Sequence, residues 1–262
     1  MFIDTHMHLE PGDDVAGLTA RAVAAGVEHM VAVGGSESMN GAALDAAARE
    51  PGRFSATVAF DRHVAETGGA GDIPGLVEQV RGMLSAPGVV GVGETGLDYH
   101  YNPETGAEQR ELFGAQLELA REAALPVVVH SREAEADTLI MLREHRRVWT
   151  HAYERLGVLH CFTGNVDMAR ELVSLGLFVS FSGIVTFRNA DSLREAAAAV
   201  PDEWLLIETD TPYLAPVPHR GKPNEPAYLP DVATCLAAVR DTSVEQIAKI
   251  TTENARRLFN LA

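Results

Sequence analysis

Short apolar runs that alternate with helical patterns are the feature of this sequence that most restricts its fold. The runs recur about every 20 to 40 residues, and most of them are followed by an Ala/Leu-rich helical pattern. Most runs lack polar alternation, which is typical of parallel strands that are covered on both faces. The sequence therefore predicts eight strands, at Phe2–Thr5, Val27–Val33, Phe54–Ala59, Val89–Gly93, Pro126–Val129, Val158–His160, Leu177–Ser180 and Trp204–Glu208.

The helical patterns between these runs complete the prediction of the fold. They lie at Leu18–Ala25, Met39–Ala48, Leu76–Ser85, Ala107–Ala123, Glu133–Glu144, Asp167–Ser174 and Ser192–Ala199, and two further helices at Leu229–Leu261 are expected to close the barrel. Eight strand–helix units favour an α/β fold of the (β/α)8 TIM-barrel type in a single domain over residues 1–262. A doubly wound open sheet is the alternative, but it would place its site at one switch point. The stretch Thr67–Gly71 is expected to be a loop within the third unit.

Composition and charge limit the classes of function. A formal net charge of −16 argues against general electrostatic binding along nucleic acid, although a metal-dependent enzyme that cleaves phosphodiesters is not excluded. Only two cysteines, Cys161 and Cys235, are present, so no disulfide framework is expected and a cytoplasmic location fits. Neither a signal peptide nor a run long enough to cross a membrane is found in the sequence.

Imidazole and carboxylate groups follow five of the predicted strands. They are His6 and His8 after the first strand, Glu94 after the fourth, His130 after the fifth, His160 after the sixth and Asp210 after the eighth. Each of these residues alone is more often a hydrogen-bonded or ion-paired side chain than a ligand. Ionisable groups that converge at the mouth of a barrel are costly unless they are paired or bound to metal, so together they indicate a metal site. Asp98 and Glu208 are expected to support neighbouring side chains rather than to bind metal.

The same motifs, in the same order, resemble those of the TatD family of metal-dependent hydrolases, which belong to the amidohydrolase-type barrels. The resemblance is carried by Asp4-Thr-His6-Met-His8-Leu, Gly93-Glu94-Thr-Gly-Leu-Asp98-Tyr, Pro126-Val-Val-Val-His130-Ser-Arg132, Leu159-His160-Cys-Phe-Thr-Gly164, Ser180-Phe-Ser-Gly183, Glu208-Thr-Asp210-Thr-Pro-Tyr213-Leu and Arg220-Gly-Lys222-Pro-Asn224-Glu225-Pro. These motifs span nearly the whole chain.

The resemblance implies two divalent metal ions per chain, with Zn, Mn and Mg as candidates. His6, His8 and Asp210 would hold one ion, and His130 and His160 the other. Glu94 would bridge both ions, since a carboxylate has two oxygens and can span two cations. Asp210 is also the candidate general base, so Glu94 and Asp210 are the predicted catalytic residues.

The resemblance further implies cleavage of phosphodiester bonds, commonly as a 3′–5′ exonuclease or deoxyribonuclease acting on single-stranded ends of nucleic acid. Candidate substrate-binding residues are Arg132, Arg220 and Lys222, because guanidinium and ammonium groups bind phosphate. The alternative is hydrolysis of a small ester, lactone or amide in a more apolar pocket. No organic cofactor is expected. The Arg- and His-rich segment Arg143–Arg155 is a departure from the family pattern that would alter substrate choice if it overhangs the mouth.

Overall fold

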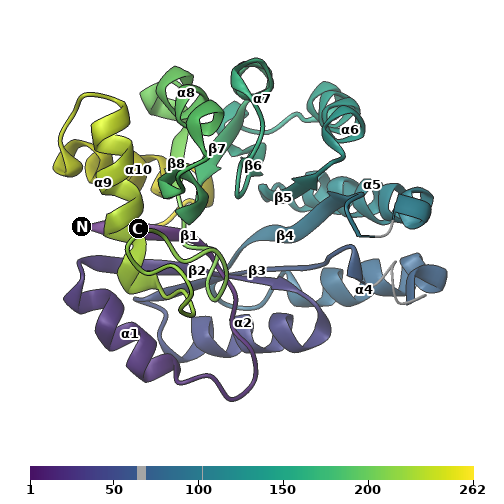
Figure 1. The fold of residues 1–262 in the computed structure, drawn as a ribbon. Coiled ribbons are helices and arrows are strands. Elements are labelled where there is room, and N and C mark those ends of the chain that lie inside the picture. The colour runs from purple at the N-terminus through teal and green to yellow at the C-terminus, as the bar shows by residue number, and fades with distance from the viewer. Residues whose placement is uncertain (64–68, 102) are drawn as a thin grey trace.

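The protein is an eight-stranded parallel barrel with helices on its outside, as seen in a computed structural model that describes residues 1–63, 69–101 and 103–262 (Figure 1). The strands lie side by side in chain order. Their bounds are β1 Phe2–Met7, β2 Val27–Gly35, β3 Phe54–Phe60, β4 Val89–Asp98, β5 Val127–Arg132, β6 Gly157–Leu159, β7 Leu177–Phe181 and β8 Leu205–Ile207. The predicted (β/α)8 fold is confirmed.

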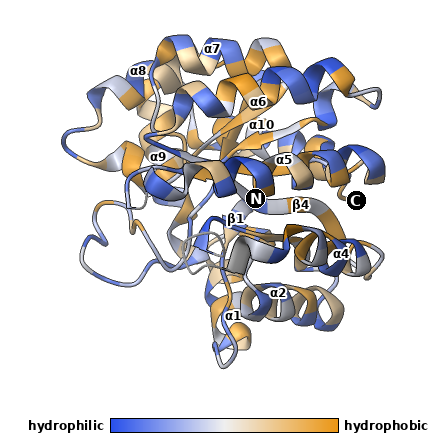
Figure 2. Cartoon of the chain, turned by 90° about the vertical axis from the view of Figure 1, so that its right-hand side faces the viewer, coloured by the Kyte–Doolittle hydropathy of each residue, from blue (hydrophilic) through white to orange (hydrophobic). Residues whose placement is uncertain are grey.

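The helices lie around the strands and carry hydrophobic and hydrophilic stripes (Figure 2). Their bounds are α1 Val15–Ala24, α2 Glu37–Arg49, α4 Ile73–Met83, α5 Gly106–Ala123, α6 Glu135–Val148, α7 Val166–Leu175, α8 Asp191–Ala199, α9 Leu229–Val239 and α10 Val244–Phe259. Side chains that prefer N-caps begin several of them: Ser36 accepts a hydrogen bond from Met39 N, and Asn165 accepts one from Met168 N. None of the helices in the described part of the chain is both long and apolar enough to cross a membrane.

The hydrophobic core has an inner and an outer layer. The inner layer fills the barrel with side chains from the strands, among them Ile3, Val128 and Phe178, and is capped by Leu258 and Phe259 of α10. The outer layer lies between the strands and the surrounding helices. The predicted role of the C-terminal helices in closing the barrel is therefore confirmed, because α10 lies against β1 and β8 at the amino-terminal end of the strands.

Strand β1 meets the chain after β8 at the carboxyl end of the barrel. Asp210 N donates to His6 O at 2.9 Å and His8 N donates to Thr211 O at 2.9 Å. Below this point the buried Asp4 carboxylate accepts hydrogen bonds from the backbone and hydroxyl of Thr209, at 2.9 and 2.6 Å. Burial raises the pKa of Asp4 to about 7, although the bonds from Thr209 oppose the shift. The seam that closes the barrel thus holds the two chain segments that carry His6, His8 and Asp210.

Two expectations from the sequence need correction. Strand β4 runs to Asp98 rather than ending at Gly93, because Thr95 to Asp98 pair with β5 in spite of the two glycines. The segment Arg143–Arg155 does not overhang the mouth, because it leads into the amino-terminal end of β6. There Arg155 Nε donates to Leu258 O at 3.3 Å, beside the α10 side chains that cap the barrel from below. The predicted loop at 67–71 is only partly tested: residues 67 and 68 lie outside the described residues, and Gly69–Asp72 form a short 3-10 helix.

Candidate metal centre

A cavity of about 960 Å³ opens at the carboxyl ends of the strands. Its lining includes five of the six predicted metal ligands, namely His8, Glu94, His130, His160 and Asp210. The sixth, His6, is fully buried next to them. The strand ends on which the sequence places these side chains therefore do converge, although the residues are up to about 200 positions apart in the chain.

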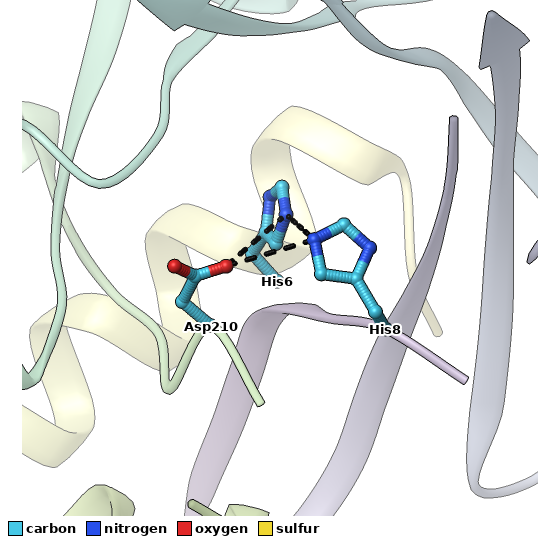
Figure 3. A group of neighbouring side chains, drawn as sticks. All are labelled: His6, His8 and Asp210. Atoms are coloured by element: carbon cyan, nitrogen blue, oxygen red, sulfur yellow. Dashed lines mark hydrogen bonds and ion pairs between the residues drawn. The ribbon is translucent and has the colours of Figure 1, made fainter. Parts of the chain in front are cut away.

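The first cluster consists of His6, His8 and Asp210, whose side chains point towards one another (Figure 3). The Nε2 atoms of His6 and His8 are 3.1 Å apart, and Asp210 Oδ1 lies 3.9 and 3.6 Å from them. Asp210 reaches this position from a left-handed backbone conformation with a φ of 61°. Its turn is held by Asn224, whose Nδ2 donates to Thr209 O and Tyr213 O, each at 2.7 Å. The loop that contains Asn224 therefore supports the first cluster.

The second cluster consists of Glu94, His130 and His160. Glu94 Oε1 lies 3.1 Å from His130 Nδ1 and 3.3 Å from His160 Nε2, and these two nitrogens are 3.3 Å apart. The other oxygen of Glu94, Oε2, lies 3.4 Å from Nε2 of His6 and 3.4 Å from Nε2 of His8. One carboxylate thus faces both clusters, each with a different oxygen.

The spacing of the donor atoms within each cluster fits a bound divalent ion. Atoms bound about 2.1 Å from a shared ion are separated by about 3.0 to 3.4 Å in octahedral or tetrahedral geometry. The contacts within the second cluster match this range, and only the contacts to Asp210 are longer. The rings of His6 and His160, one from each cluster, are stacked with their centroids 3.8 Å apart and their planes at 11°.

Hydrogen bonds at the outer ring nitrogens orient three of the four imidazoles. His8 Nδ1 donates to Val33 O at 3.0 Å, His160 Nδ1 lies 3.3 Å from Glu208 Oε1, and His130 Nε2 lies 3.2 Å from Asp98 Oδ2. A proton held at the outer nitrogen leaves the lone pair of the inner nitrogen available to a metal. The fourth imidazole, His6, has a buried Nδ1 without a hydrogen-bond partner among the described residues.

Glu208 is fully buried and lies beneath the second cluster. Its oxygens accept hydrogen bonds from Cys161 N at 2.6 Å and from Ser180 Oγ at 2.5 Å, besides the contact with His160. Like Asp98, which contacts His130, it lies at the outer nitrogen of a histidine, where the sequence predicts a supporting role. His6, His160 and Glu208 also lie close enough together to be possible metal ligands, and this group shares one histidine with each of the two clusters.

Buried carboxylates and imidazoles in the site shift the pKa values of one another. Burial opposes ionisation of Glu94, but His160 and hydrogen bonds from His130 and other imidazoles hold its pKa well below its usual range. Burial also opposes charging of His160, yet Glu94 and Glu208 raise its pKa to about 10, and Asp210 and Glu94 raise the pKa of His8. Protons on these imidazoles balance the buried carboxylates, and divalent ions would displace them on binding.

Of the three predicted substrate-binding residues, only Arg132 lines the described cavity. Arg132 lines the cavity and lies against Tyr101, with Nη1 3.3 Å from its hydroxyl. In contrast, neither Arg220 nor Lys222 is among the residues that line the described cavity. Instead the guanidinium of Arg220 lies 3.7 Å over the ring of Phe187.

Several residues of the cavity wall were not predicted as site residues, among them Asp61, Arg62 and Tyr213. Arg62 Nε lies 3.1 Å from Asp98 Oδ2, and its Nη1 lies 3.9 Å from Glu94 Oε1. Asp61 and Arg62 could have been found from their position at a strand end, because they directly follow the apolar run of β3. Tyr213 comes three residues after Asp210, and the sequence does not indicate that the turn between them brings the Tyr213 side chain to the cavity.

Comparisons with known sequences find a family and relatives that match nearly the whole chain. The family model described as TatD related DNase matches residues 3–260. The uncharacterized metal-dependent hydrolase YabD of Bacillus subtilis is 38% identical over 264 residues, which cover 100% of both chains. The protein named 3′-5′ ssDNA/RNA exonuclease TatD of Edwardsiella piscicida is 37% identical over 254 residues, covering 95% of this chain and 94% of that one.

The comparison with solved structures gives the same result. The crystal structure of YJJV, a TatD homologue from Escherichia coli K12, superposes with a TM-score of 0.87 at 28% identity and covers 100% of this chain and 98% of that chain. An organophosphorus hydrolase variant from Deinococcus radiodurans shares the fold, with a TM-score of 0.65 at 15% identity, covering 98% of this chain and 92% of that chain. The whole-chain matches and the shared barrel establish that the chain belongs to the TatD-related DNase family of metal-dependent hydrolases.

Proposed function

We propose that this chain is a two-metal phosphodiesterase that removes nucleotides from the 3′ ends of single-stranded DNA or RNA. The observation that carries the proposal is the position of Glu94, whose two oxygens face two separate groups of imidazoles at the base of the cavity. Support for the nucleic-acid substrate comes from the name of the Edwardsiella relative.

In this proposal His6, His8 and Asp210 hold one ion, His130 and His160 hold the other, and Glu94 spans both. Two divalent cations in such a site acidify water and polarise the phosphoryl oxygens. Asp210 lines the cavity, so its carboxylate can accept the proton that the attacking water loses. Hydrogen bonds that His130 and His160 donate to Asp98 and Glu208 keep the two imidazoles in the orientation that binding requires.

The charges of the wall favour an anionic substrate. The cavity is lined by the carboxylates of Asp61, Glu94 and Asp210 and by the guanidinium groups of Arg62 and Arg132. Two divalent ions would add four positive charges, so that the cations would exceed the three carboxylates. A phosphodiester complements this excess better than a neutral carbonyl group does.

The second candidate is hydrolysis of a small ester, lactone or amide. It is favoured by the apolar part of the wall, which is formed by Met39, Ile184 and Leu214. The same pair of ions would polarise a carbonyl oxygen.

Metal reconstitution tests both candidates. Metal-stripped protein is reloaded with Zn, Mn or Mg singly and assayed on single-stranded DNA and RNA that are labelled at either end, beside a lactone. Stepwise loss of nucleotides from the 3′ end, absent without metal and absent in Glu94→Ala, is the expected result. A loaded protein that cleaves the lactone but neither nucleic acid would favour the second candidate, and full activity of Glu94→Ala would refute the two-metal site.

A further inference from the structure

Arg62 occupies a position that the proposed ligand set does not explain. It follows β3, lines the cavity and has a side chain that is only 13% exposed. Its guanidinium lies between two carboxylates: Nε is 3.1 Å from Asp98 Oδ2, and Nη1 is 3.9 Å from Glu94 Oε1. That Glu94 oxygen is the one that faces His130 and His160. A permanent cation therefore lies beside the second cluster.

Such a cation works against the binding of a divalent ion at the second cluster, because like charges a few ångströms apart repel one another in a partly buried site. The Asp98 carboxylate does not need Arg62 as a partner, because His130 Nε2 already lies 3.2 Å from Asp98 Oδ2. An anion bound between the ions and the guanidinium would convert this repulsion into attraction. Guanidinium is suited to this role because it stays charged at every working pH and matches the geometry of phosphate oxygens.

We propose that Arg62 binds a non-bridging phosphoryl oxygen of the substrate and thereby selects phosphodiesters over neutral esters. The inference rests on the proposed function, because it assigns a substrate contact to that same site. It places the phosphoryl group between Arg62 and the ions that the clusters would hold, in the cavity that Arg132 also lines. Arg62 is then a specificity-determining residue of the reaction rather than a support for the metal ligands.

A purely positioning role would have a different signature. If Arg62 only held Asp98 in place, its loss would loosen His130 and weaken metal binding. If Arg62 binds the phosphoryl group, its loss weakens phosphate binding, whereas metal binding stays as tight as before or becomes tighter. The two roles therefore predict opposite changes in metal affinity.

The test compares Arg62→Gln and Arg62→Lys with wild type, and uses Arg110→Gln as the matched control. Arg110 also pairs with a carboxylate, Asp137 at 3.1 Å, but it does not line the described cavity. Three quantities are measured: kcat and KM on a labelled single-stranded oligonucleotide, inhibition of the loaded enzyme by inorganic phosphate, and the affinity of metal-stripped protein for Mn or Zn by titration.

We expect Arg62→Gln to lower kcat/KM and to weaken phosphate inhibition, each by about 10- to 100-fold, as for the loss of a hydrogen bond to a charged group. Metal affinity should be unchanged or higher, Arg62→Lys should recover part of the loss, and Arg110→Gln should match wild type. Unchanged phosphate inhibition in Arg62→Gln, or a loss of metal affinity that accounts for the loss of activity, would overturn the inference. A wild-type enzyme that cleaves no nucleic acid refutes the proposed function instead, and the phosphate inhibition of its lactone hydrolysis still decides the role of Arg62.

Discussion

We predict that the buried imidazole of His145 makes the stability of this protein sensitive to acid. Its imidazole lies on α6 with 4% of the residue exposed, and its Nε2 has no hydrogen-bond partner among the described residues. The ring packs against Trp149, with 5.3 Å between the ring centroids. Burial lowers the pKa of His145 to about 4, from an ordinary value of 6.5, and the nearby Glu118 opposes the shift only partly.

The direction of the effect follows from the difference in bound protons. Between pH 6.5 and about 4 the unfolded chain protonates this imidazole and the folded chain does not, so protons favour unfolding. The stabilising contribution is complete above the unfolded pKa and is lost as the pH falls towards the folded pKa. With 1.36 kcal/mol for each pKa unit, the loss is about 2 kcal/mol at pH 5 and about 3 kcal/mol below pH 4.

The substitution His145→Leu removes the titrating group and replaces it with an apolar side chain of similar size. Urea unfolding of wild type and variant at about pH 7.5 and about pH 5 gives the four free energies that are needed. We expect the variant to gain about 2 kcal/mol relative to wild type on acidification. Parallel pH dependences of the two proteins would refute the reasoning. The control is turnover of the metal-loaded variant, which should equal that of wild type because α6 ends at the end of the barrel opposite the cavity.

Three further predictions concern the site. Glu208→Gln should weaken metal binding about 10- to 100-fold without unfolding the chain, because it removes the charge that faces His160 Nδ1. An unchanged metal titration would contradict this role of Glu208. Gly96→Ala should destabilise the protein by about 2 kcal/mol or more, because its φ is 138° and the new Cβ would meet His130 O at 2.0 Å; a wild-type melting temperature would show that the reasoning is wrong. A divalent metal at about 100 times its Kd should raise the free energy of unfolding of wild type by about 2.7 kcal/mol, and that of Glu94→Ala by much less. Equal increases in the two proteins would argue against metal binding through Glu94.

The order of the elements could be predicted because it depends on local patterns. Apolar runs of strand length, helical patterns between them and N-cap residues such as Ser36 are properties of neighbouring residues. The carboxyl ends of parallel strands then meet at one end of a barrel, so the positions of Glu94, His130 and Asp210 at the strand ends were enough to expect that they meet. Burial could not be inferred in the same way. The segment Arg143–Arg155 has the charged composition of a surface, yet it contains the buried His145 and packs below the barrel.

What the sequence determined by itself is the barrel and the set of residues that gather at its mouth, because strand direction and side-chain alternation are repeated in every unit. Only the tertiary structure decided how these residues face one another. It shows that the two oxygens of Glu94 address different imidazoles, that Asn224 holds the turn of Asp210, and that Arg62 rather than Arg220 lies in the cavity wall. Distances between donor atoms depend on strand register, on the seam between β1 and β8 and on loop packing, and these are contacts between segments that no local pattern in the chain encodes.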